Sequence, residues 1–444
     1  MLHVVALIAT IGFVILSTTL GRLHPFVALI LASFGYGIAT GMPFDLLLNA
    51  INSGFGNTIA YIGIVIVAGS IIGTLLQRSG AAGSIAAAVL RITGPRRVPL
   101  AMGLLGYIVS MPVYCDTGYI LLSPINRGLA RTAGISIAGG AIALSLGLYA
   151  THTMVPPTPG PVAAAGIMQA DLGLVIVWGL IVSLVALAGG LAFVYLYVSR
   201  VQLSVPDEQP VETAELTQDA PPSVRMALLP IVVPITLIIG RSVSLMPDKP
   251  FGEGTLAMLC QNIGQPAVAL LIGVALALFL PKPMSRDIVS ESGWFGEAIR
   301  NSALIIVITG AGGAFGRVLQ DSGIADIVGA STVGQEYGLL LPFILAAVIK
   351  TAQGSSTVAI VTTASIVAPL LGSLGLDSEQ ARALTVVAIG AGSMVVSHAN
   401  DSYFWVVTQF TGMTVKQGYQ LQSAGTAIQG MVAATVVMVI GALL

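Results

Sequence analysis

The stretch VPLAMGLLGYIVSMPVYCDTGYILLSPIN at residues 98–126 is mostly apolar and uncharged apart from Asp116, and arginines flank both of its ends. These flanking arginines are Arg78, Arg91, Arg96 and Arg97 before it, and Arg127 and Arg131 after it. Because basic loops lie on the cytoplasmic side of a membrane, both ends are expected there. A single helix of about 29 residues would be roughly 43 Å long, too long for one span, whereas two spans need roughly 40 residues. The stretch therefore predicts a re-entrant helical hairpin with its tip near residues 111–118.

Composition indicates that the whole chain lies in a membrane. Its 444 residues are 55% hydrophobic and only 8% charged, compared with roughly 25% charged residues in soluble domains. The mean hydropathy is +0.94. Uncharged runs of at least span length occur at 46–77, 132–170, 172–199, 254–281, 351–376 and 417–444. These features predict an all-α polytopic membrane protein with about ten transmembrane helices and two re-entrant hairpins.

Several functional classes receive no support from the sequence. A net charge of −1 without a basic tail argues against a nucleic-acid partner. Cys115 and Cys260 are too few for a disulfide framework or a CxxC metal site. No phosphate-loop, HExxH or GxSxG motif is present, so an ATP-driven motor or an enzyme is not expected. We also predict no cofactor.

A hydrophilic stretch at 201–224 divides the chain into two predicted repeats, at 1–200 and 225–444. A second hairpin is predicted across 339–371. The charged residues around it are mostly acidic, which favours an outward opening: Asp321, Asp326, Glu336, Asp377, Glu379 and Arg382. The basic residues Lys282, Arg286 and Arg300 place the preceding loop inside. Five predicted spans in each half mean that the repeats insert with inverted topology.

Identical residues recur in the two halves at one constant offset. The matched pairs are Gly69 with Gly312, Gly73 with Gly316, Leu76 with Leu319, Gln77 with Gln320, Ser79 with Ser322 and Gly80 with Gly323. His152 and His398 follow at nearly the same offset. Chance similarity between glycine-rich helices is the alternative explanation. Inverted repeats with broken helices are typical of secondary transporters, which bind substrate and coupling ion near the breaks.

Two polar interruptions inside apolar runs are the predicted helix breaks. The first, THTMVPPTPGP at 151–161, contains four prolines, which lack the N–H donor that a helix needs. A surface loop is the alternative, but the run around it is uncharged. We expect Thr151, His152 and Thr153 to bind substrate at this break.

The second break is SHANDS at 397–402. We expect Ser397, Asn400 and Ser402 to bind substrate and His398 or Asp401 to carry a coupled proton, since intramembrane ionisable residues mark ion paths. Two alternatives stay open: His398 as a buried histidine bonded to backbone, and Asp401 as a helix cap.

Polar residues at the two hairpin tips complete the predicted site. The expected substrate ligands there are Asp116, Thr117, Gln353, Ser355, Ser356 and Thr357. Helix N-termini direct free N–H groups at an anion, and hydroxyl groups suit a hydroxylated carboxylate. Asp116 is also a candidate for the coupled proton. Simple capping of the second hairpin helix by its serines is the alternative. No metal ligands are expected.

Five motifs resemble those of the gluconate permease (GntP) family, in the same order along nearly the whole chain. They are SGFGNT at 53–58, PVYCDTGYILLSP at 112–124, THTMVPPTPGP at 151–161, AQGSSTVA at 352–359 and SHANDSYFW at 397–405. The resemblance implies a proton symporter for gluconate or a related sugar acid or small hydroxy acid in the bacterial inner membrane. It also implies an elevator-like homodimer of the ion transporter superfamily, surrounded by lipid. Sodium coupling, a D-serine-like substrate, and a passive channel or exchanger stay open.

Overall fold

The computed structural model describes residues 2–94, 97–133, 135–203, 221–246, 248–281, 285–324 and 338–444. Most of the predicted linker at 201–224 lies outside these ranges, as do the predicted topological markers Arg96, Lys282, Asp326 and Glu336. Throughout the described ranges the regular structure is helical and contains no strand. The predicted all-α class is therefore confirmed.

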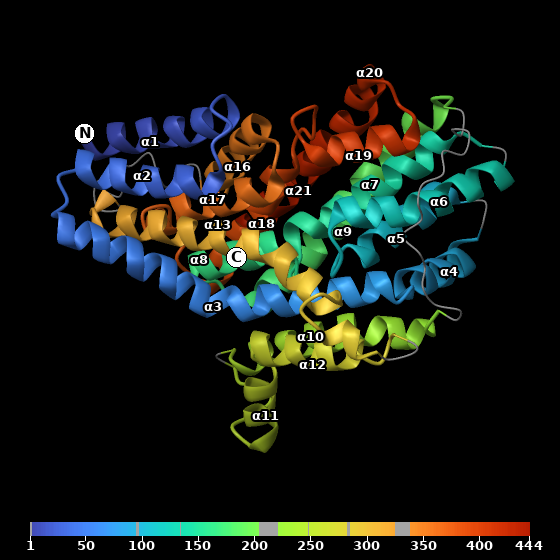
Figure 1. Cartoon of the computed structure of the whole chain (residues 1–444), viewed down its shortest axis with the longest axis horizontal. Coiled ribbons are helices and arrows are strands. Elements are labelled where there is room, and N and C mark those ends of the chain that lie inside the picture. Colours follow the sequence, from blue (N-terminus) through green and yellow to red (C-terminus); the bar gives the residue numbers. More distant parts are fainter. Residues whose placement is uncertain are drawn as a thin grey trace.

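The first half of the chain forms α1 to α9. The helices are α1 (Leu2–Thr19), α2 (Pro25–Ala39), α3 (Phe44–Arg78), α4 (Ala81–Thr93), α5 (Val98–Val109), α6 (Cys115–Ala133), α7 (Ile137–Met154), α8 (Pro159–Met168) and α9 (Leu172–Leu196). Three helices then lie to one side of the molecule, where α11 projects away from the rest (Figure 1). They are α10 (Val224–Ser244), α11 (Thr255–Ile263) and α12 (Pro266–Ala277).

The second half repeats the order of long helix, helical hairpin, broken helix and final helix. Its helices are α13 (Trp294–Asp321), α16 (Leu340–Gln353), α17 (Ser356–Val367), α18 (Glu379–Met394), α19 (Ser402–Thr411), α20 (Val415–Gly418) and α21 (Ala424–Leu443). This order parallels α3, α5, α6, α7, α8 and α9. The inverted orientation of the two halves stays a prediction.

Six helical stretches in the described ranges are long and apolar enough to cross a membrane, and seven if the pair α11 and α12, bent by 74°, is one span. The six are Phe44–Arg78, Ile137–Met168, Leu172–Arg200, Val224–Ser244, Arg286–Asp321 and Val415–Leu443. The polytopic character is thus confirmed. The count of about ten spans stays a prediction, because the remaining apolar helices are shorter.

The chain breaks at both predicted hairpin tips. Residues 110–114 separate α5 from α6, and Gly354 and Ser355 separate α16 from α17. Gly354 has a φ of +84°, a left-handed conformation that glycine adopts without strain. The broken helices are also present, with α7 ending before the prolines and α18 ending before the SHANDS motif.

Glycines hold these elements close together. The long helices α3 and α13 run side by side (Figure 1), and a Cβ atom on Gly54 would lie only 2.5 Å from the Gly313 carbonyl oxygen. The matched glycines Gly73 and Gly316 each lie against a hairpin, next to Pro112 and Ser365 respectively. The tip of the first hairpin therefore lies against α3, and α17 of the second hairpin packs against α13.

Candidate functional site

A cavity of about 280 Å³ lies where the hairpin tips meet the helix breaks. Its walls come from the start of α6, the end of α7, the α16–α17 tip and the residues that precede and begin α19. Nine of the predicted site residues line it: Asp116, His152, Gln353, Ser355, Ser356, Thr357, Asn400, Asp401 and Ser402. The structure thus brings together four segments that are far apart in the sequence. Binding by these residues stays a prediction.

The other predicted residues lie outside the cavity wall. The hydroxyl groups of Thr151 and Thr153 donate to the carbonyl oxygens of Tyr107 and Tyr149, at 3.0 and 3.1 Å. Thr117 is part of α6 but does not line the cavity. Nε2 of His398 lies 2.9 Å from the Thr351 carbonyl oxygen, so the backbone bond of the alternative is present, but His398 is half-buried rather than buried.

Ser397 also lies behind the wall, where it supports Asp401. Its hydroxyl group donates to Asp401 Oδ2 at 2.6 Å. Oδ1 of the same carboxylate accepts the Tyr403 backbone N–H at 3.1 Å, so Asp401 caps α19. The capping alternative is therefore what the structure contains, and the capping carboxylate also faces the cavity.

Lys350 is the charged partner of Asp401, and the sequence analysis did not select it. Its side chain is fully buried near the end of α16, and Nζ lies 2.6 Å from Asp401 Oδ2. Nζ also donates to the Gly354 carbonyl oxygen at 2.5 Å. One signal was available: Lys350 is the sole charged residue between Glu336 and Asp377. A lone lysine in an apolar hairpin needs a buried counter-ion.

Several buried polar atoms in the cavity wall have no hydrogen-bond partner among the described residues. They are Asp116 Oδ1, His152 Nδ1, the hydroxyl oxygens of Tyr114 and Tyr149, and both polar side-chain atoms of Gln353. Buried polar groups are nearly always bonded to protein, water or ligand. These atoms are therefore free to contact water or a bound solute.

The family model that matches this chain is described as "GntP family permease" and aligns with residues 1–443. The chain belongs to the GntP permease family. The family resemblance that the five motifs indicate is thus confirmed, and so is the expectation of a transporter rather than an enzyme. Together with the apolar helices, family membership makes the chain a multi-pass bacterial inner-membrane protein.

Relatives in the GntP family are similar over nearly their whole length. A gluconate permease of Pseudomonas aeruginosa is 34% identical, with 99% of this chain and 97% of the relative covered. The low-affinity gluconate transporter of Escherichia coli is 31% identical, with 94% and 93% covered. The D-serine transporter DsdX of Escherichia coli is 32% identical, with 96% and 95% covered.

Two solved structures share the fold of this GntP family member. The YdaH transporter of Alcanivorax borkumensis superimposes with a TM-score of 0.64 at 19% identity, over 94% of this chain and 98% of that one. MtrF of Neisseria gonorrhoeae gives a TM-score of 0.63 at 15% identity, over 88% and 83%. At these identities the likeness concerns the fold alone.

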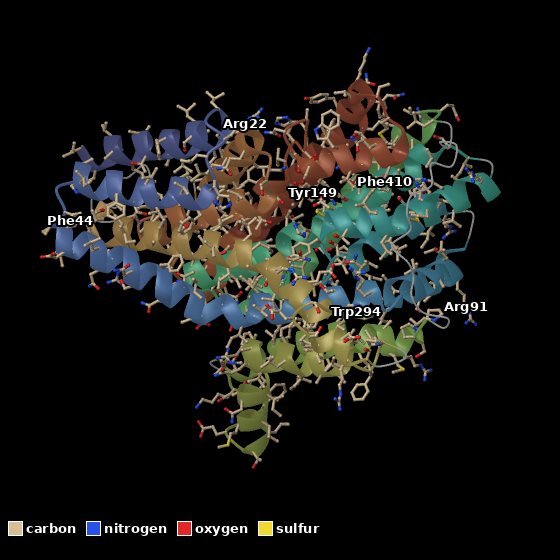
Figure 2. The ribbon with its side chains drawn as sticks, viewed as in Figure 1. Arg22, Phe44, Arg91, Tyr149, Trp294 and Phe410 are labelled. Carbon is tan, nitrogen blue, oxygen red and sulfur yellow. The ribbon has the colours of Figure 1, made fainter. Side chains whose placement is uncertain are left out.

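Aromatic side chains join the two halves of this GntP permease beside the cavity. The rings of Tyr149 and Tyr403 are 5.1 Å apart, and Figure 2 shows Tyr149 in the interior of the molecule. The Tyr403 hydroxyl group donates to the Ser145 carbonyl oxygen at 3.0 Å. The hydroxyl groups of Tyr119 and Thr411 lie 2.9 Å apart. Helices α6 and α7 are thus bonded directly to α19.

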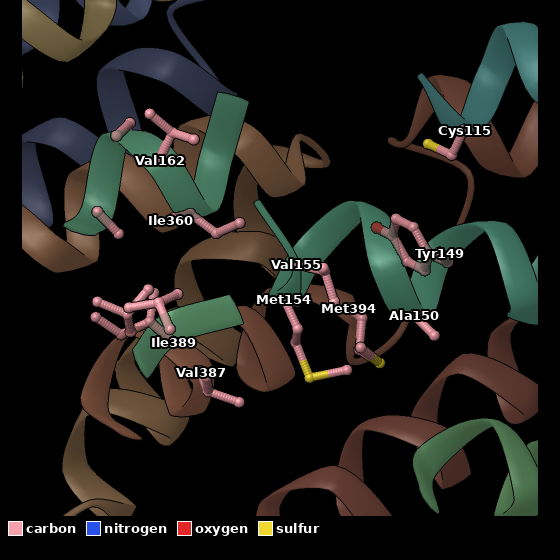
Figure 3. Close-up of a cluster of buried hydrophobic side chains, with 14 of the residues drawn as sticks. Cys115, Tyr149, Ala150, Met154, Val155, Val162, Ile360, Val387, Ile389 and Met394 are labelled. Carbon is pink, nitrogen blue, oxygen red and sulfur yellow. The ribbon is translucent and has the colours of Figure 1, made fainter. Parts of the chain in front are cut away.

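An apolar core supports the ends of the broken helices. Met154 and Val155 at the end of α7 lie close to Met394 at the end of α18 (Figure 3). All three are fully buried. Burial of one such side chain stabilises a structure by roughly 1.5–3 kcal/mol. This core joins the end of α7 to the end of α18.

Replacing Tyr403 with phenylalanine should lower the free energy of unfolding by about 1 kcal/mol, because one buried hydrogen bond is lost while the ring contacts with Tyr119 and Tyr149 remain. Chemical denaturation in detergent measures the change. Tyr419→Phe is the matched control, since Tyr419 is 44% exposed. Equal stability of the two variants would show that the bond to Ser145 does not contribute.

Proposed function

We propose that this permease takes up gluconate, or a related sugar acid or small hydroxy-carboxylate, together with a proton. The observation that carries the proposal is the chemistry of one cavity. Serine, threonine and amide side chains line one part of it, and Asp116 presents a buried carboxyl oxygen that has no partner within the part of the chain that the structure describes. Hydroxyl and amide groups suit a polyhydroxylated acid, and a buried carboxyl group suits a transported proton.

The start of α17 offers a place for the substrate carboxylate. Ser355 caps this helix, and its hydroxyl group accepts the Val358 backbone N–H at 3.4 Å, a long bond. Ser355, Ser356 and Thr357 all line the cavity. A helix N-terminus carries partial positive charge and free N–H groups that stabilise an anion. We place the carboxylate there and the hydroxylated carbons toward Gln353 and Asn400.

The size of the cavity and the names of the relatives support a small hydroxylated acid. A volume of about 280 Å³ lies just below the usual range for drug-sized ligands. Relatives named for gluconate and for D-serine are about equally similar to this chain. Both compounds carry a hydroxyl group near a carboxylate, which is the feature that the cavity is suited to bind.

We propose alternating access of the elevator type in a homodimer. In such a movement, the hairpins and breaks that surround the substrate would travel as a unit. Their mutual contacts support this: the Asn400 amide group donates to the carbonyl oxygens of Thr351 and Ala352, at 2.8 and 3.1 Å. The tip of the second hairpin and the second break are therefore bonded to each other.

Uptake of labelled gluconate into proteoliposomes tests the proposed function. An inward pH gradient should drive accumulation above the external concentration, while protein-free liposomes should show none. Accumulation driven by sodium alone would assign sodium coupling at the broken-helix carbonyls instead. Equilibration without accumulation would indicate a channel or exchanger. Competition by unlabelled sugar acids, small hydroxy acids and D-serine would then rank the substrates.

A further inference from the structure

We infer that Asp116 carries the coupling proton, and that Lys350 is a positioning residue that keeps Asp401 a charged carboxylate throughout transport. This inference rests on the proposed proton symport. It selects one carboxyl group among the three ionisable candidates of the sequence analysis and adds a role for Lys350. The argument compares the surroundings of the two carboxyl groups that line the same cavity, Asp116 and Asp401.

The Asp401 carboxylate accepts three hydrogen bonds. Oδ2 accepts hydrogen bonds from Lys350 Nζ and Ser397 Oγ, both at 2.6 Å, and Oδ1 accepts the Tyr403 N–H. A proton on Oδ2 would displace one of these donors. It would also leave the Lys350 ammonium group, which is fully buried, without its counter-ion. Breaking a buried ion pair on one side is strongly unfavourable.

Asp116 has no comparable support. Oδ1 is without a partner among the described residues, and the Cys115 thiol lies 3.8 Å from Oδ2, a weak contact. The ionisable groups that face the same cavity are Tyr114 and Cys115 beside it, Tyr149 and His152 on α7, and Asp401 and Tyr403 at the second break. Lys350 lies behind Asp401 and is already paired with it. An ionised Asp116 therefore faces a second negative charge without a cation of its own.

Charge balance then couples the proton to the substrate. A substrate carboxylate that enters while Asp116 is ionised is the third carboxylate at the cavity, and Lys350 balances the charge of one of them, Asp401. A proton on Asp116 removes one of these charges and supplies an O–H donor. After the substrate leaves, the first turn of α6, where Asp116 lies, stabilises the ionised form and allows the proton to depart. One proton accompanies one monovalent acid, so the cycle moves no net charge.

Lys350 holds the hairpin tip and the second break in position and does not itself take part in proton transfer. Nζ bonds both Gly354 at the hairpin tip and Asp401 at the second break, so it joins the two segments. A neutral pair of similar shape can replace a buried ion pair when both partners are changed together. Asparagine at 401 would still cap α19. The double variant Lys350→Met/Asp401→Asn loses both Nζ bonds but leaves no buried charge unpaired, and the Asn400 bonds to Thr351 and Ala352 still join the two segments.

The test compares this double variant with Asp116→Asn in gluconate binding and in transport by proteoliposomes. In the wild type, the apparent Kd for gluconate should rise by up to about tenfold for each unit of increasing pH, as linkage to one proton requires. In Asp116→Asn it should change less than about twofold per unit. This variant should exchange gluconate across the membrane but not accumulate it under a pH gradient. The double variant should transport more slowly, yet keep the pH-dependent Kd and a ratio of one proton per gluconate.

Either of two results would overturn the inference. One is pH-driven accumulation by Asp116→Asn. The other is a double variant that is monodisperse in detergent and exchanges gluconate, but has lost both its proton movement and its pH-dependent Kd. If the wild type itself moves no proton with gluconate, the proposed symport fails instead. A membrane potential clamped to zero should leave wild-type uptake unchanged, and strong dependence on the potential would contradict the one-to-one ratio.

Discussion

Replacing Lys350 with methionine is expected to lower the free energy of unfolding by about 3–5 kcal/mol, because it leaves the Asp401 carboxylate buried without a cation. The lost bond from Nζ to the Gly354 carbonyl oxygen also loosens the hairpin tip. Uptake of gluconate should fall to background. Denaturant titration in detergent and proteoliposome uptake measure the two effects.

Lys416→Met is the matched control for this substitution. Lys416 is exposed on α20, so the same chemical change should alter stability by less than about 0.5 kcal/mol. Adding Asp401→Asn to Lys350→Met should restore most of the stability, since no charge then remains buried. If Lys350→Met alone unfolds like the wild type, the buried pair does not stabilise the junction between α16 and α19.

Replacing Gly354 with alanine should be the second most damaging change. The left-handed conformation at this position, with φ of +84°, costs an L-residue roughly 1–2 kcal/mol. An added Cβ atom would also collide with the Asn400 carbonyl group, whose carbon would lie only 2.6 Å away. The tip of the second hairpin would then have to separate from the second break. We expect a loss of at least 3 kcal/mol, as roughly the sum of the two effects, and uptake reduced at least tenfold.

Gly375→Ala separates the two causes. Gly375 has a φ of +69°, but no atom lies within 4 Å of the position of an added Cβ atom. This variant therefore bears only the conformational cost, about 1–2 kcal/mol, and should transport normally. Equal stability and uptake in the two alanine variants would show that the hairpin tip and the break are not in close contact.

The helix breaks were predictable because their causes are local. Prolines at 156, 157, 159 and 161 remove backbone donors, and α7 accordingly ends at Met154 while α8 begins at Pro159. The second break has no proline, yet polar residues at 397–402 interrupt an apolar run, and α18 and α19 are separate there. Backbone chemistry and hydrophobicity act over a few residues, so a single sequence contains this information.

The partners of the site residues were not predictable in the same way. Asp401 was a candidate for the proton, but the structure gives it Lys350, which precedes it by 51 positions in the chain. Tyr149 and Tyr403 are in contact across the two halves, and the sequence around one tyrosine does not indicate the other. Thr151 and Thr153 do lie at the first break, as predicted, but their hydroxyl groups donate to backbone carbonyl oxygens and not to the cavity. Such pairings depend on how helices pack, which local patterns do not describe.

The sequence by itself determined that this protein lies in a membrane, which family it belongs to and where its helices break. These follow from hydrophobicity, from the missing donors of proline and from motifs that lie within short segments. Only the tertiary structure decided which of the two cavity carboxyl groups is neutralised by a cation. Electrostatic stabilisation depends on distances of a few ångströms between α16, α6 and the start of α19, and folding alone sets these distances.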